Sequence, residues 1–316
     1  MINCFQLKVT QVRPDIERNV VMIDDPFGPA ITLPEIQCIV ASQETEAGCV
    51  KINEKRQEAG LSQLDIELID LAEDADRQLS IEEEKISSSS GRIRLLGTRL
   101  RPALRPWDRE AGPYIIGLTG GSASGKSSVA RRLEELGWGC VDCDKMGHLA
   151  YSPGQEAHAK VIQEFGQEVL ASDGNIDRRA LGAIVFSDKS RLTALNNIVW
   201  PEISRLALAR AEELWRSGAK VVVLDAAVLL EAGWEAECHE IWVCVVPRSE
   251  AVKRIVERDK KTEEEAERRL DSQKSNEERV RVASTVISSL WDPDITRQQV
   301  VRAVTRLNTE LGLSDA

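Results

Sequence analysis

Residues 114–138 read YIIGLTGGSASGKSSVARRLEELGW, and this stretch decides the fold of the segment that follows it. Ile115 and Ile116 open it as a short apolar run, which is typical of a buried strand. Val129, Leu133 and Leu136 then recur at the spacing of an amphipathic helix, and a glycine follows as a helix cap. The stretch therefore predicts a strand, a glycine-rich turn and a helix in direct succession.

The turn itself fits the pattern G-x-x-x-x-G-K-[ST], which predicts a phosphate-binding loop. Its glycines let successive backbone N–H groups converge on phosphate oxygens, and the helix start adds positive charge. Lys126 supplies a charge for the terminal phosphates, and the Ser127 hydroxyl is a ligand for Mg²⁺. The predicted nucleotide-binding residues are Gly120, Gly121, Ser122, Ala123, Ser124, Gly125, Lys126, Ser127 and Ser128.

Two other interpretations of the turn are less favoured. A Gly/Ser turn without a ligand would not require a strand before it and a helix after it. A dinucleotide-binding turn wants G-x-G-x-x-G, whereas here the first two glycines are adjacent and Lys-Ser follows the last.

Composition limits the classes of function. The chain has 316 residues and a net charge of −11, which argues against a non-specific nucleic-acid binder because such a protein needs a basic surface. No stretch is long and apolar enough for a membrane helix, and the first residues do not resemble a secretory signal. The seven scattered cysteines predict a reducing, cytoplasmic compartment.

A parallel α/β sheet is predicted from the phosphate loop onward. Apolar runs predict strands at 114–118, 138–141, 221–225, 240–246 and 285–288, with a mostly helical region between the second and the third. Apolar residues at helical spacing over 295–311 predict a closing helix.

A second, incomplete β-α-β series precedes it. We expect strands at 19–23, 36–42 and 64–71, with a helix over 50–60. Residues 101–113 contain three prolines and no period, which is typical of a linker. We therefore expect a partial domain over 1–100, a linker over 101–113 and a phosphate-loop domain over 114–316.

Carboxylates follow two of the predicted strands, at the edge where the ligand clefts of α/β sheets open. Asp142 and Asp144 suit a catalytic base and a Mg²⁺ contact, although either could simply cap the next helix. Asp225 ends another strand and suits Mg²⁺, or it is only a strand-end carboxylate. Cys140 and Cys143 form C-x-x-C, but a redox or zinc role is less favoured because no further ligands are well spaced.

Residues 247–281 are dense in charge, and Thr262 with Glu265 makes a capping box. Most of these charges fit a solvated helix face. A lid over a nucleotide would need a few arginines that point inward to neutralise transferred phosphate.

Several segments together resemble the dephospho-coenzyme A kinases. GLTGGSASGKS at 117–127, Asp142-Cys143-Asp144 with His148, NIDRRALGAIVFSD at 175–188 and RLDSQ at 269–273 are similar to family motifs over about residues 114–290. The resemblance implies a P-loop parallel sheet with a helical substrate part and a lid. It also implies transfer of the ATP γ-phosphate to the ribose 3′-hydroxyl of dephospho-coenzyme A.

The resemblance also assigns roles to single residues. Lys126 and the loop would bind ATP with Mg²⁺, Asp142 would be the catalytic base, and Arg258 and Arg269 would act from the lid. Asp144, His148 and Arg178 would surround the acceptor. Residues 199–201, Val-Trp-Pro, replace the His-Pro of bacterial members, and Ser284-Thr285 replaces an Ala-Asp pair, so a contact from that Asp is not expected.

The front segment resembles the second half of a Rossmann-like nucleotidyltransferase, a phosphopantetheine adenylyltransferase of the animal form. DPFGPAI at 25–31, VKINEKR at 50–56 and KISSSSGR at 85–92 carry this likeness. The combination is similar to the animal bifunctional coenzyme A synthases, in a truncated form. The family's H-x-G-H motif is absent, since all three histidines lie after residue 140. We therefore expect no adenylyltransferase activity. We also expect the incomplete domain over residues 1–100 to bind protein partners.

Two other functions remain open. A non-catalytic, regulatory product would bind ATP without turnover, and another nucleotide kinase would use a different acceptor. Family analogy also allows association with the mitochondrial surface.

Overall fold

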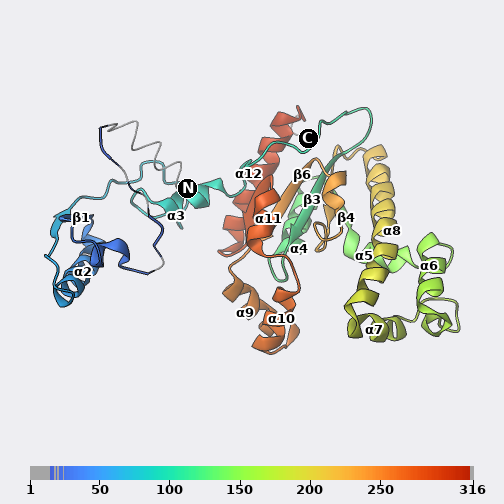
Figure 1. Cartoon of the computed structure of the whole chain (residues 1–316). Helices are drawn as coiled ribbons and strands as arrows, with labels where there is room; N and C mark the ends of the chain where they lie inside the picture. The colour runs from blue at the N-terminus through green and yellow to red at the C-terminus, as the bar shows by residue number, and fades with distance from the viewer. Residues whose placement is uncertain (1–14, 18, 20, 24, 314–316) are drawn as a thin grey trace. The chain divides into compact units, whose positions relative to one another are not determined.

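The computed structural model describes residues 15–17, 19, 21–23 and 25–313, apart from the side chains of His148, Phe186 and Ser187. The chain divides into two compact units, one up to residue 87 and one from residue 88 (Figure 1). We describe each unit by itself.

The second unit is built on a five-stranded parallel sheet in the order β4-β5-β3-β6-β7. Its strands are β3 (Tyr114–Gly120), β4 (Gly139–Asp142), β5 (Val221–Asp225), β6 (Glu240–Val245) and β7 (Thr285–Ser288). All five strands lie within one or two residues of the predicted ranges. The predicted α/β fold class is confirmed.

β3 lies in the middle of the sheet and pairs with β5 on one side and β6 on the other (Figure 1). All of its residues are buried, as are all of those in β5. The chain leaves β3 toward β4 and later returns to the other side at β6, so the strand order reverses next to β3. Ligand clefts open at the carboxyl ends of strands at such a reversal. The phosphate loop follows β3 at this point.

Helices cover both faces of the sheet. α4 (Lys126–Glu135) and α12 (Pro293–Glu310) pack over one face, around Ile116, Leu118 and Val300. The other face is covered mainly by the helical part of the unit, whose longest helix, α8, contains Pro201. This part consists of α5 (Cys143–Ala150), α6 (Glu156–Phe165), α7 (Arg178–Ser187) and α8 (Lys189–Arg216).

Three shorter helices follow β6 and carry the charged region. They are α9 (Arg248–Asp259), α10 (Glu263–Asp271) and α11 (Asn276–Val282). Thr262 caps α10 in a box with Glu265, as the sequence predicts. The predicted closing helix corresponds to α12.

The boundary between the units differs from the expected one at residue 100. α3 (Ser88–Leu95) and the segment after it belong to the second unit. The Gly97 amide donates to the Val286 carbonyl at 2.9 Å, and the Leu100 amide donates to the Ser284 carbonyl at 2.7 Å. The physical reason is that β7 is an edge strand, and this segment satisfies its free carbonyl groups. Part of the expected linker, including Leu104, which bonds to His239, therefore runs along the sheet.

The first unit contains a small β-α-β arrangement. β1 (Cys38–Ala41) and β2 (Asp65–Leu68) are parallel, and α2 (Glu46–Glu58) lies between them in the chain. Arg56 is fully buried and donates to the Ala30, Leu33 and Ser62 carbonyls, among others. These elements confirm three of the front predictions. The strand expected at 19–23 is wrong for residues 19 and 21–23, and residue 20 lies outside the described residues.

No helix among the described residues is long and apolar enough to cross a bilayer.

Candidate functional site

The phosphate loop connects the end of β3 to the start of α4 in a tightly constrained turn. A Cβ added at Gly120 would lie 2.7 Å from the Cys244 carbonyl oxygen and 2.5 Å from the Ser124 Oγ. At Gly121 the nearest atoms to an added Cβ are 3.8 Å away, which is ordinary contact. Gly125 caps α4 with a φ of +86°, a conformation that glycine adopts without strain. The close packing against β6 therefore requires glycine at 120 but not at 121.

Ala123 adopts a φ of +61°, which is uncommon for a residue with a side chain. Arg254 of α9 holds this part of the loop in place. Its Nη1 donates to the Ala123 carbonyl at 3.3 Å and to Ser289 Oγ at 2.8 Å. Ser289 Oγ donates in turn to the Ser124 carbonyl at 2.9 Å. These contacts connect the loop with α9 and with the end of β7.

A cavity of about 700 Å³ opens over the loop, a volume typical of a small-molecule site. All nine loop residues that the sequence predicts to bind nucleotide line it. The lid consists of α9, α10 and the connection after α10. The other lining residues come from α5, the segment after β5 and this lid: Asp144, Ala227, Arg254, Glu257, Arg258, Arg269 and Gln273.

Lys126 points between two carboxylates at the edge of this cavity. Its Nζ lies 3.3 Å from Asp144 Oδ2 and also forms an ion pair with Asp225. Burial works to lower the pKa of Lys126, but the charges of Asp225 and Asp144 outweigh it, and the pKa lies above its ordinary value. The ammonium is therefore charged and directed at the space where phosphate would enter.

The two aspartates after β4 have different surroundings. Asp142 caps α5, because its Oδ1 accepts the Lys145 amide at 3.1 Å while Oδ2 pairs with the Lys145 ammonium. Burial works to raise its pKa, but the hydrogen bonds and charge of Lys145 outweigh it, and the pKa lies below its ordinary value. Asp144 lines the cavity, and its side chain is 51% exposed. The helix-capping alternative thus applies to Asp142.

The two side chains predicted to bind Mg²⁺ both carry oxygen. Ser127 lines the cavity at the start of α4, and Asp225 ends the neighbouring strand with its carboxylate 10% exposed. Among the described residues, no cluster of three or more His, Cys, Asp or Glu side chains could hold a metal alone. A hydroxyl and one carboxylate suit Mg²⁺ only when phosphate oxygens and water complete its shell.

The lid contributes two of the predicted arginines, and one acid holds both. Asp259 accepts from Arg258 at 2.7 Å and from Arg269 at 2.8 Å. The Nε of Arg269 also donates to Ser122 Oγ at 3.0 Å. Asp259 follows Arg258 directly, but nothing in the local pattern distinguishes it from its charged neighbours. Sequence reasoning therefore missed its role, and that of Arg254.

The predicted acceptor residues are less well connected to the cavity. Arg178 begins α7, and it is not among the residues that line the cavity. His148 belongs to α5, but its side chain lies outside the described part of the structure.

Cys140 and Cys143 are free thiols, and burial raises the pKa of each to about 12, which favours the neutral thiol. Ser284, at the place of the expected family departure, bonds the Ile241 backbone in the sheet.

Comparison with known proteins points to one family. The family model described as dephospho-CoA kinase matches residues 114–290. A dephospho-CoA kinase from Carboxydothermus hydrogenoformans is 42% identical over 187 residues, which cover 59% of this chain and 91% of that protein. One from Geobacter sulfurreducens is 43% identical over 186 residues, covering 59% and 94%.

A solved structure has the same fold as the second unit. The crystal structure of a Thermus thermophilus protein aligns with a TM-score of 0.54 and 34% sequence identity. The alignment covers 62% of this chain and 98% of that one. The similarity extends over nearly all of the bacterial relatives, and the family model lies within the second unit of this chain.

Proposed function

We infer the function from a premise that the comparisons establish: this chain belongs to the dephospho-CoA kinase family. Its activity is the ATP-dependent phosphorylation of dephospho-coenzyme A, in coenzyme A synthesis. One observation supports this most directly. The phosphate loop, Asp144 and two lid arginines come from segments more than 100 residues apart at the extremes, yet they line one cavity.

Lys126 and the loop amides, apart from the Ser122 amide that donates to Gln273, would bind the ATP phosphates. The terminal phosphate would take over the Lys126 ammonium from Asp144, because a phosphate dianion carries more negative charge than one carboxylate. Arg258 and Arg269 would then turn from Asp259 toward the transferred group and neutralise its charge. Ser127, and Asp225 directly or through water, would hold Mg²⁺, which would supply positive charge to offset that of the phosphates.

The catalytic base is one of the two aspartates after β4. The family resemblance suggests Asp142, but two observations favour Asp144. Asp144 lines the cavity, whereas Asp142 is engaged by Lys145 on both oxygens. A carboxylate whose pKa is lowered by hydrogen bonds is also a weaker base. Arg178 and His148 remain proposed contacts of the acceptor.

ADP release in the presence of dephospho-coenzyme A tests the proposal. Purified chain with ATP and Mg²⁺ should release ADP only when this acceptor is added, and adenosine or AMP should not replace it. Asp144→Asn should lose turnover and keep ATP binding, and Asp142→Asn should retain more turnover. ATP binding without turnover on any acceptor would favour the regulatory alternative, and turnover on AMP alone would favour another nucleotide kinase.

We propose a separate origin for the front unit, as part of a phosphopantetheine adenylyltransferase domain. Support comes from the quoted motifs and from the β1-α2-β2 arrangement. Because no H-x-G-H motif is present, the chain should form no pyrophosphate from ATP and phosphopantetheine. Detectable pyrophosphate release would contradict this. Protein partners of the front unit and a cytoplasmic or mitochondrial-surface location are also proposals.

A further inference from the structure

The lid meets the phosphate loop through Gln273, which lies in the short connection between α10 and α11. Its Oε1 accepts the Ser122 backbone amide at 2.9 Å, and its Nε2 donates to Ser122 Oγ at 3.1 Å. One carboxamide therefore holds both the backbone and the side chain of a loop residue. Glutamine is suited to this because it offers an acceptor and a donor on the same planar group.

The backbone next to Gln273 is fixed by an ion pair whose arginine is buried. Arg279 of α11 donates through Nη1 to the Lys274 carbonyl. Its Nη2 donates to Glu231 Oε1 at 3.3 Å, and the same oxygen accepts the Lys274 amide at 3.3 Å. The Glu231–Arg279 pair thus holds the Lys274 residue from both its amide and its carbonyl.

The position of this pair connects the loop, the lid and the segment after β5. The Arg279 side chain is 2% exposed, and its Nη1 would lie 3.8 Å from a Cβ on Gly121. Glu231 comes from the segment after β5, in a different part of the sequence. A cavity of about 250 Å³ borders Ser122, Gln273 and Arg279. Packing alone therefore leaves space around Gln273, and hydrogen bonds decide where it lies.

We propose that Arg279 and Glu231 are positioning residues for nucleotide binding: they hold Lys274 so that Gln273 keeps the phosphate loop in its binding shape. Arg279, Glu231 and Gln273 do not act on the transferred phosphate. The inference rests on the proposed function in one respect, that ATP is the nucleotide bound. The pair should therefore change the affinity for ATP more than the rate of phosphoryl transfer.

The experiment measures the ATP Kd by calorimetry on the full chain, together with kcat and the KM for each substrate. Gln273→Ala removes both bonds to Ser122, and Arg279→Met removes the support of Lys274. Each should raise the ATP Kd and KM about tenfold, the effect of losing one to two hydrogen bonds, and leave kcat within about threefold. The KM for dephospho-coenzyme A should not change. Arg281→Met is the matched control, since Arg281 lies on the same helix with a 73% exposed side chain.

A double variant distinguishes positioning from a structural role. If Arg279 acts through Gln273, Gln273→Ala with Arg279→Met should bind ATP no more weakly than Gln273→Ala alone. Arg279→Lys should recover part of the affinity, because one ammonium can reach one of the two partners. If Arg279→Met is insoluble, Glu231→Gln carries the same test with a smaller change.

Three results would overturn the inference. They are additive losses in the double variant, an unchanged ATP Kd in Arg279→Met despite lower thermal stability, or equal effects of Arg279→Met and Arg281→Met. Failure of the proposed function is distinguishable from these, because the unmodified chain would then fail to bind ATP or to phosphorylate the acceptor.

Discussion

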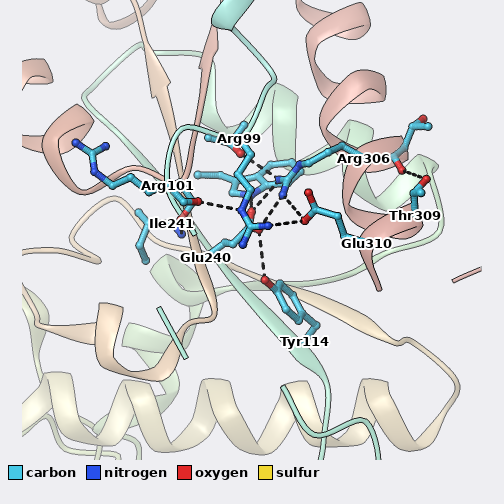
Figure 2. A network of polar contacts seen from close by, with 12 residues as sticks. Arg99, Arg101, Tyr114, Glu240, Ile241, Arg306, Thr309 and Glu310 are labelled. Carbon is cyan, nitrogen blue, oxygen red and sulfur yellow. Dashed lines mark hydrogen bonds and ion pairs between the residues drawn. The ribbon is translucent and has the colours of Figure 1, made fainter. Parts of the chain in front are cut away.

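Loss of the Arg306 guanidinium should destabilise the second unit strongly, because it would leave a buried carboxylate without its counter-ion. Glu240 begins β6, and its side chain is 0% exposed. Arg306 of α12 donates to both of its oxygens at 2.9 Å. Tyr114 and Trp242 add hydrogen bonds of 3.3 and 2.8 Å. Figure 2 shows Arg306 and Tyr114 directed at this carboxylate, and Glu310 paired with Arg306.

The size of the effect follows from the burial. Arg306→Met leaves the buried Glu240 side chain with two neutral donors, and removing one partner of a buried pair costs about 3–5 kcal/mol in free energy of unfolding. Glu240→Gln should cost about 1–3 kcal/mol, because Arg306 is 17% exposed and keeps Glu310 as a partner at 3.0 Å. Replacing both residues by Met removes the charges together and should cost less than Arg306→Met alone.

Urea unfolding followed by tryptophan fluorescence is a suitable assay. All seven tryptophans lie after residue 88, so the signal reports on the second unit alone. Arg210→Met is the control, because Arg210 forms an exposed pair with Glu213 and should change stability by less than about 0.5 kcal/mol. A loss below about 1 kcal/mol in Arg306→Met, or a double variant as unstable as Arg306→Met, would refute the reasoning.

Three further predictions concern the loop and the sheet. Gly120→Ala should abolish measurable ATP binding in calorimetry, because its Cβ would collide with the Cys244 carbonyl, whereas Gly121→Ala should bind within a few fold of the unmodified chain; equal affinities would contradict the packing argument. Ala123→Gly should raise the melting temperature in calorimetry by roughly 2–4 °C, because glycine adopts a positive φ without the strain of about 1 kcal/mol that alanine has there. A melting temperature below that of the unmodified chain would show that this strain is absent. His239 should titrate in NMR with a pKa of about 4, because burial, together with the charge of Arg105, opposes its protonation. The imidazole becomes protonated near pH 6.5 in the unfolded chain but only near pH 4 in the folded chain. The neutral His239 therefore contributes up to ~3 kcal/mol to the free energy of unfolding, which is fully present above pH 6.5 and is lost as the pH falls toward 4. A His239 resonance that titrates near 6.5 would exclude this pH dependence.

The amino-acid sequence alone predicted the elements and the kind of site. Apolar runs marked all five strands of the second unit, since a strand buried on both faces is apolar throughout, and helical spacing marked α4 and α12. The phosphate loop was also readable, because its backbone geometry requires glycines at fixed spacing before Lys126. Both kinds of signal depend on residues that are close together in the sequence, so they can be recognised without the structure.

Tertiary structure decided the partners of each charged group. Nothing in the sequence distinguished Asp259, which holds two lid arginines, or Arg279, which reaches Glu231 and the Lys274 backbone. The segment around Gly97 was assigned to the front domain from the sequence, but its amides bond an open sheet edge of the second unit. Some of these contacts join residues far apart in the chain, as Arg279 with Glu231, and depend on the packing of several elements at once. The same types of charged residue occur on solvated helix faces and in buried ion pairs, and only their burial in the folded structure distinguishes the two cases.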